Sequence, residues 1–95
     1  MAAYVIADIE VTASAAYEEY RRRVPALIAA YGGRYLVRGG AVEVLEGDAR
    51  PQRLVILEFP DRERLRAFYQ SAEYRELIPI RQQASRGSLI AVDGV

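Results

Sequence analysis

The sequence of 95 residues contains no cysteine, histidine, lysine or tryptophan, so all 13 of its basic residues are arginine. Without cysteine there is no disulfide, no thiolate nucleophile and no cysteine-ligated zinc or iron–sulfur site. Without histidine the commonest metal ligand and general base is missing, and without lysine no Schiff base can form. Proton transfer is left to aspartate, glutamate and tyrosine, and we expect neither a metal nor a bound cofactor.

Charge gives the molecule no overall preference for anionic partners. Thirteen acidic residues balance the 13 arginines, so the formal net charge is zero. No whole-molecule field then favours nucleic acid or an anionic membrane surface. A hydrophobic content of 52% with 27% charged residues is typical of a globular chain. The length suits one domain over residues 1–95.

The apolar run near the start of the chain is short. Asp8 and Glu10 interrupt it well before it reaches the length of a membrane span or a secretion signal. We therefore expect a cytoplasmic protein that makes no membrane contact.

Hydrophobic periodicity separates a first strand from a first helix. Ala3–Val11 is rich in β-branched and aromatic residues, which indicates a strand. In residues 14–31 apolar side chains recur every three or four positions, which indicates a helix. Pro25 lies inside this region, so we expect a kink or two short helices there. Gly32-Gly33 should end the helical region.

A hairpin is expected next. Residues 34–46, broken by Gly39-Gly40, and residues 52–59 both have strand composition. The segment 47–51 between them is short and rich in turn residues, so the two strands should pair as a hairpin.

The last part of the chain predicts further helix and one more strand. Asp61 is expected to cap a second helical region, and Ser71 to cap a further turn that Pro79 interrupts. Residues 88–92 should form the final strand.

This order of elements predicts an α+β fold of the ferredoxin-like βαββαβ type, a four-stranded antiparallel sheet with both helical regions on one face. The central strands are apolar on both faces, although a sheet that is wet on one side should alternate apolar and polar residues. The open face is therefore expected to be buried against a second copy of the chain, giving a homodimer.

Several stretches together resemble the domain of unknown function 1330 family along essentially the whole chain. They are Tyr31–Gly40, Val42–Gly47, Glu58–Pro60 and Phe68–Tyr74. The resemblance implies a ferredoxin-like protomer in the dimeric α/β-barrel superfamily, in which two sheets pack face to face around a lumen. It implies no assigned reaction, because relatives in that superfamily include cofactor-free monooxygenases, small-ligand binders and heme enzymes.

Candidate chemistry depends on the register of the hairpin. If Glu43 pairs with Arg53, then Arg38 lies opposite Glu58 among apolar neighbours. We assign this face, together with the face of the first strand that carries Asp8, to the lumen. Arg38 would then bind a carboxylate or enolate, and Glu58 or Asp8, with a pKa raised by burial, would act as a general base. The alternative is a cross-strand ion pair that only fixes the register.

A second candidate set surrounds the break in the second helical region. Tyr69 and Tyr74 flank this break and Arg81 follows it, so the three could form a rim around an acidic or phenolic ligand. The alternative is that they only pack against the core.

These residues support two classes of function. The first is a small-molecule-binding dimer, including a cofactor-independent enzyme that uses arginine, carboxylate and tyrosine groups in the lumen. The second is a non-catalytic structural or regulatory homodimer whose lumen is filled by side chains. Heme binding is disfavoured, because only tyrosine could serve as an axial ligand from the protein.

Overall fold

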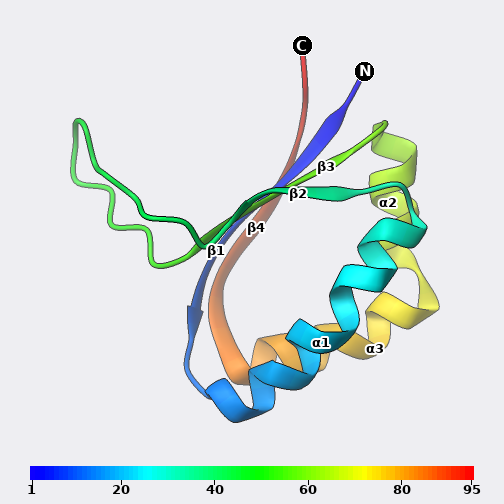
Figure 1. The fold of residues 1–95 in the computed structure, drawn as a ribbon, viewed down its shortest axis with the longest axis horizontal. Coiled ribbons are helices and arrows are strands. Elements are labelled where there is room, and N and C mark those ends of the chain that lie inside the picture. Colours follow the sequence, from blue (N-terminus) through cyan, green and yellow to red (C-terminus); the bar gives the residue numbers. More distant parts are fainter.

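A computed structural model describes all 95 residues and shows three helices packed on one face of a four-stranded sheet (Figure 1). The elements follow in the order β1 (Ala3–Val11), α1 (Ser14–Ala30), β2 (Arg34–Arg38), β3 (Leu54–Phe59), α2 (Arg62–Gln70), α3 (Ala72–Ala84) and β4 (Ser85–Asp93). The strand order is β2-β3-β1-β4, and every neighbouring pair is antiparallel. This confirms the predicted ferredoxin-like α+β fold.

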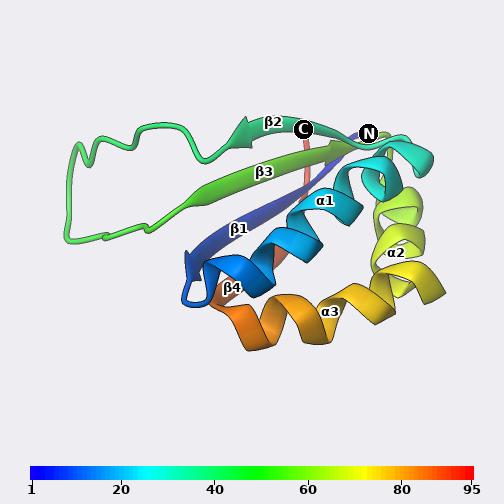
Figure 2. The same cartoon turned by 60° about the horizontal axis from the view of Figure 1, so that its bottom comes forward.

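The two faces of β1 differ in burial. Ala3, Val5, Ala7 and Ile9 are buried beneath the helices, and the residues between them face away from the helices and are only half-buried. The same strand therefore forms the floor of the helix–sheet core and the centre of the open face. Figure 2 shows the helices on one side of the sheet and nothing on the other.

The first helix ends where glycine was expected to end it. Gly32 has φ +79°, and the backbone N–H of Gly33 donates to the carbonyl of Ile28 at 2.9 Å. A Cβ on Gly33 would stand 2.6 Å from the Phe59 ring, so helix and strand can approach this closely only because the residue is glycine.

Both internal prolines are accommodated within helices. The expectation that Pro25 divides the first helical region into two short helices is wrong, because α1 runs unbroken from Ser14 to Ala30. The expected interruption at Pro79 is also wrong, since α3 continues to Ala84. Val24 beside Pro25 is buried in the core. Such packing outweighs the local cost of a proline, which is about 3 kcal/mol in a helix interior.

The two predicted caps are present. The Asp61 side chain accepts from the backbone N–H of Arg64 at 2.7 Å at the start of α2. Ser71 accepts from the backbone N–H of Tyr74 at 3.1 Å at the start of α3. These caps divide the second helical region into two helices at Ser71.

The predicted hairpin is shorter than expected. β2 ends at Arg38, and residues 39–53 form an extended arm without regular secondary structure that projects from the sheet (Figures 1 and 2). Gly39, at φ +73°, turns the chain away just after β2. The apolar residues of the arm are all exposed, Val42 by 45%, Val44 by 42% and Leu45 by 83%. This segment has the apolar content of a strand, but it has no partner strand to pair with and so does not extend the hairpin.

Candidate functional site

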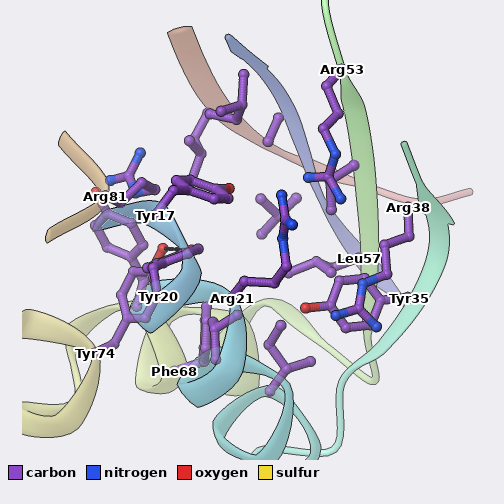
Figure 3. Close-up of a pocket in the computed structure, with 18 residues that line it drawn as sticks. Tyr17, Tyr20, Arg21, Tyr35, Arg38, Arg53, Leu57, Phe68, Tyr74 and Arg81 are labelled. Atoms are coloured by element: carbon purple, nitrogen blue, oxygen red, sulfur yellow. Dashed lines mark hydrogen bonds between the residues drawn. The ribbon is translucent and has the colours of Figure 1, made fainter. Parts of the chain in front are cut away.

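A cavity of about 60 Å³ lies between the sheet and the helices of the single chain (Figure 3). Much of its sheet side consists of apolar residues from β1 and β3, among them Val5, Ala7 and Leu57. α1 contributes Tyr17 and Tyr20, and α2 and α3 close the remaining sides. A mostly apolar concave site with a few polar groups is the usual form of a small-ligand pocket.

Two tyrosine hydroxyls meet in this cavity. The Oη atoms of Tyr20 and Tyr74 lie 2.8 Å apart and share a hydrogen bond, although the residues are 54 positions apart in sequence. Burial raises the pKa of both side chains above the usual range of tyrosine, so both are neutral near pH 7. One O–H is used within the pair, and the other has no acceptor in the protein. The pair can therefore donate one hydrogen bond to a ligand.

Four arginines also line the cavity, and no aspartate or glutamate does; they are Arg21, Arg38, Arg53 and Arg81. Arg81 of α3 is only 8% exposed, makes no ion pair, and has a buried Nε without a hydrogen-bond partner. Figure 3 shows its side chain at the end of the cavity closed by Tyr17 and Tyr20, with Arg38 and Arg53 at the opposite end. The cavity is thus positively charged at both ends.

Arg38 reaches this cavity because of an irregularity in β2. The observed register pairs Arg34 with Glu58 and Arg38 with Val55, and a β-bulge lies between Tyr35 and Val37. The predicted pairing of Arg38 with Glu58 is therefore wrong. The extra residue reverses the alternation of faces, so that Arg38 shares the helix-covered face with Tyr35. Its guanidinium carbon lies 4.3 Å from the centre of the Tyr35 ring.

Glu58 lies on the open face of the sheet, outside the cavity. It accepts from Arg34 Nε at 2.8 Å and from the Tyr4 hydroxyl at 3.0 Å. Hydrogen bonds from Arg34 and Tyr4 hold the pKa of Glu58 below its usual range. The general-base role expected for Glu58 assumed a raised pKa, which is the opposite of this direction.

Asp8 also lies outside the cavity, on the open face of β1. Its carboxylate accepts from the backbone N–H groups of Gln52 at 2.9 Å and Arg53 at 3.4 Å. Asp8 therefore fastens the end of the arm to the sheet just before β3 begins.

The four residues predicted to bind ligand all line one cavity; they are Arg38, Tyr69, Tyr74 and Arg81. The prediction placed Arg38 in a lumen between two sheets, whereas the structure places it between sheet and helices. Tyr17, Tyr20, Arg21 and Arg53 were not among the predicted site residues. Tyr17 and Arg21 are four residues apart and so share a helix face. This spacing of four residues is the feature of the sequence that could have placed Arg21 beside Tyr17 in the site.

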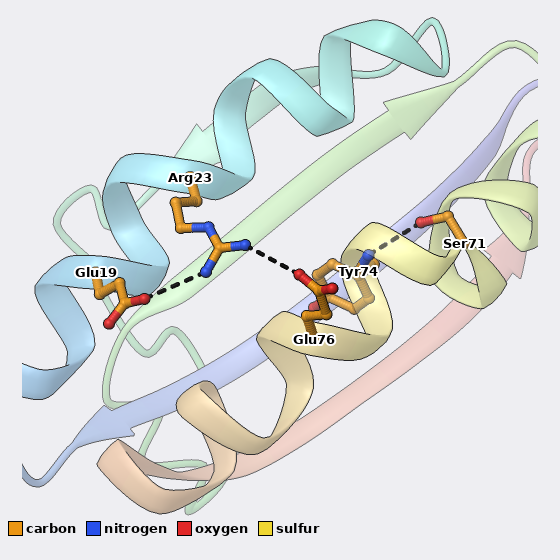
Figure 4. A network of polar contacts seen from close by, with 5 residues as sticks. All are labelled: Glu19, Arg23, Ser71, Tyr74 and Glu76. Carbon is orange, nitrogen blue, oxygen red and sulfur yellow. Dashed lines mark hydrogen bonds and ion pairs between the residues drawn. The ribbon is translucent and has the colours of Figure 1, made fainter.

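The packing of α1 against α3 encloses the cavity on its helical side. Arg23 of α1 bonds to Glu19 at 3.2 Å and to Glu76 of α3 at 3.3 Å, as Figure 4 shows. All three side chains are exposed, so this network contributes little to stability. The buried Tyr20 and Tyr74 rings also join the two helices edge to face, with centroids 6.2 Å apart.

A second hollow, of about 320 Å³, lies between α2 and β4. Its polar side chains, Arg66, Tyr69 and Gln70, are all exposed, and none is a buried group that lacks a partner. It therefore offers a ligand no unsatisfied buried polar group. We take the helix–sheet cavity as the candidate site.

Neither a metal cluster nor a membrane helix is present. No three aspartate or glutamate side chains are grouped closely enough to hold a metal ion. None of the three helices has the length and apolar character that crossing a bilayer requires.

Three solved structures share this fold at low sequence identity. A protein of unknown function from Rhodopseudomonas palustris, RPA0582, matches with a TM-score of 0.78 and 19% identity, over 99% of this chain and 82% of its own. SnoaB from Streptomyces nogalater, described as a cofactor-independent oxygenase, matches with a TM-score of 0.59 and 14% identity, over 99% and 92%. A conserved protein from Methanosarcina mazei Go1 matches with a TM-score of 0.59 and 20% identity, over 97% and 91%.

These likenesses show that the chain shares the fold of the three solved structures. No curated protein matches the sequence. Residues 2–95 match a single family along nearly the whole length. The chain belongs to the family described as Domain of unknown function (DUF1330).

Proposed function

We propose that this chain binds a small organic molecule in the cavity between its sheet and its helices. The observation that supports this most is the Tyr20–Tyr74 pair, because both tyrosines line a mostly apolar cavity and one of their two hydroxyl protons has no acceptor in the protein. Buried polar groups are normally hydrogen-bonded, so an unused donor in such a place is suited to a ligand.

The ligand is small or enters by displacing side chains at the cavity mouth. A volume of about 60 Å³ holds only a few water molecules. Arg21 is half-buried and Arg38 is exposed, so both long side chains can swing outward. We expect a molecule with a single aromatic ring to enter the cavity once these side chains have moved.

Phenol is a suitable probe, because it is neutral near pH 7 and carries one hydroxyl on one ring. We expect millimolar phenol to shift the backbone amide NMR signals of Val5, Tyr20 and Tyr74. Ala7→Ile fills the sheet side of the cavity and should abolish these shifts. Ala67→Ile, on the exposed face of α2, should leave them unchanged. Absence of cavity shifts in the wild type would contradict the proposal.

A catalytic role is a second candidate, supported by the fold that the chain shares with SnoaB. No carboxylate lines the cavity, so such a role would use tyrosine and arginine. An oxygen electrode should then record oxygen uptake with an electron-rich polyphenol above the rate in buffer, and Tyr20→Phe should lower it. Uptake equal to that in buffer would favour a binding or regulatory protein without chemistry.

The proposal includes a homodimer in which a second copy of the chain covers the open face of the sheet. Ile6 pairs with Ile56 on one side and Ile90 on the other, which places three isoleucines side by side on that face. Ile90 is 58% exposed and the neighbouring Val92 is 43% exposed. Apolar surface of this kind on a sheet is normally buried against another layer.

A further inference from the structure

We infer that the ligand of the helix–sheet cavity is an organic anion, a small aromatic carboxylate in its simplest form, whose charge is bound by Arg81. This inference rests on the proposed function, because it specifies the chemical class of the molecule that enters the same cavity. Four observations support it.

The first observation is the state of Arg81 itself. More than nine-tenths of this residue is buried, it lines the cavity, and its side chain makes neither an ion pair nor a hydrogen bond. Buried charges in proteins are normally paired, because desolvation of a lone ion is costly. The Arg81 guanidinium is thus a buried cation that has no anionic partner within the chain.

The second observation is that no carboxylate is placed to neutralise the cavity. Glu18 pairs with Arg21 at 3.3 Å on the exposed side of α1, and Glu76 of α3 pairs with Arg23. Neither glutamate lines the cavity, and Glu58 and Asp8 lie on the other face of the sheet. The chain itself therefore offers Arg81 no carboxylate partner within the cavity.

The third observation is the set of donors beside Arg81. A guanidinium presents a planar fork of N–H donors that matches the two oxygens of a carboxylate. The Tyr20–Tyr74 pair supplies one further O–H donor. Figure 3 shows these groups at the same end of the cavity. A carboxylate there can accept from both the arginine and the tyrosine pair.

The fourth observation concerns the rest of the cavity. Arg21, Arg38 and Arg53 stand along its other parts, and each adds positive potential that attracts an anion toward the opening. Between the two ends the surface is apolar and aromatic, and the Phe68 and Tyr74 rings lie 4.5 Å apart. This combination suits a molecule with one anionic group on an aromatic body.

The experiment compares benzoate with benzamide, which have nearly the same shape but differ in charge. Both are titrated into the full chain in a buffer of low salt, and binding is followed through the amide NMR signals of the cavity residues. We expect benzoate to bind at least ten times more tightly than benzamide. Added sodium chloride should reduce this preference.

Variants then identify the arginine that binds the charge. Arg81→Met should remove the preference for benzoate and leave the affinity for benzamide within a factor of two. Arg75→Met, on the exposed face of the same helix, should change neither affinity. Arg81→Lys retains the charge without the planar fork, so it should preserve part of the preference.

Equal binding of benzoate and benzamide in the cavity would refute the anionic ligand and leave the proposed function intact. A preference for benzoate that survives in both Arg81 variants would refute the assignment to Arg81. If benzoate, benzamide and phenol all fail to shift the cavity signals, the proposed function fails as well.

Discussion

The effect of Arg81 on the stability of the free protein can distinguish a structural role from a ligand-binding role. A side chain kept only for packing stabilises the free protein, whereas a charge kept for a ligand destabilises the protein until the ligand binds. Arg81 has the features of the second case, because it is buried without an ion pair.

Arg81→Met should therefore stabilise the unliganded chain. Methionine fills much of the same volume without the buried charge, and the expected gain is about 1 kcal/mol or more in the free energy of unfolding. Urea denaturation of the wild type and the variant measures this difference, with Arg75→Met as the exposed control. A loss of 1 kcal/mol or more would assign Arg81 to structure instead.

Glu58 gives a prediction about pH with a definite sign. Arg34 and Tyr4 depress its pKa in the folded state, so its contribution to stability is present above the ordinary glutamate pKa. That contribution is lost as the pH falls through the lower folded value. The destabilisation caused by Glu58→Gln should therefore be larger at about pH 6 than at about pH 2.

Urea denaturation at the two pH values tests this, and Glu43→Gln in the exposed arm provides the control. A raised pKa, as the general-base role would need, would give the opposite trend. An effect of Glu58→Gln that is larger at the lower pH would thus reinstate Glu58 as a candidate base.

At the scale of elements, the structure follows the sequence where local chemistry determines it. Asp61 and Ser71 cap helices as expected, and Gly32 ends α1. The prolines show the limit of local rules, because burial of the surrounding residues holds both helices unbroken. The position of Arg38 could not be predicted, since one bulged residue in β2 reverses the face on which it lies.

The cap at the start of α3 links an element to the site. Ser71 accepts from the backbone N–H of Tyr74, as Figure 4 shows. Its hydroxyl also donates to the carbonyl of Phe68 at 2.8 Å. Ser71→Ala removes both bonds and should lower the free energy of unfolding by about 1 kcal/mol. Ser88→Ala, at an exposed position of β4, should change it by less than about 0.5 kcal/mol. Equal effects of the two substitutions would show that the cap contributes nothing.

At the scale of the whole molecule, apolarity on both faces of β1 indicated two buried surfaces. The helices cover one of them, and its cavity contains the candidate site. The other surface remains open in the single chain. Arg38, which was expected in a lumen on that open face, lies on the helix-covered face instead. The alternation of residues along a strand shows which side chains share a face of the sheet. Only the three-dimensional structure shows which face borders a cavity.

The open face predicts the oligomeric state. Size-exclusion chromatography with light scattering at micromolar concentration should give a mass of about twice 10.6 kDa. Ile90→Arg places a charge in the middle of the apolar strip and should shift the mass toward the monomer. Gln83→Arg, on the exposed side of α3, should leave the dimer intact. A monomeric wild type would rule out a dimer formed through this face.

A ligand of this chain should lie between the sheet and the helices of one chain, and not between two sheets. Isotope-filtered NOE spectra of the labelled protein with phenol locate the ring directly. We expect contacts from the phenol ring to the side chains of Val5 and Tyr20, on the covered face. Contacts to Ile6 and Ile56, on the open face, would contradict it.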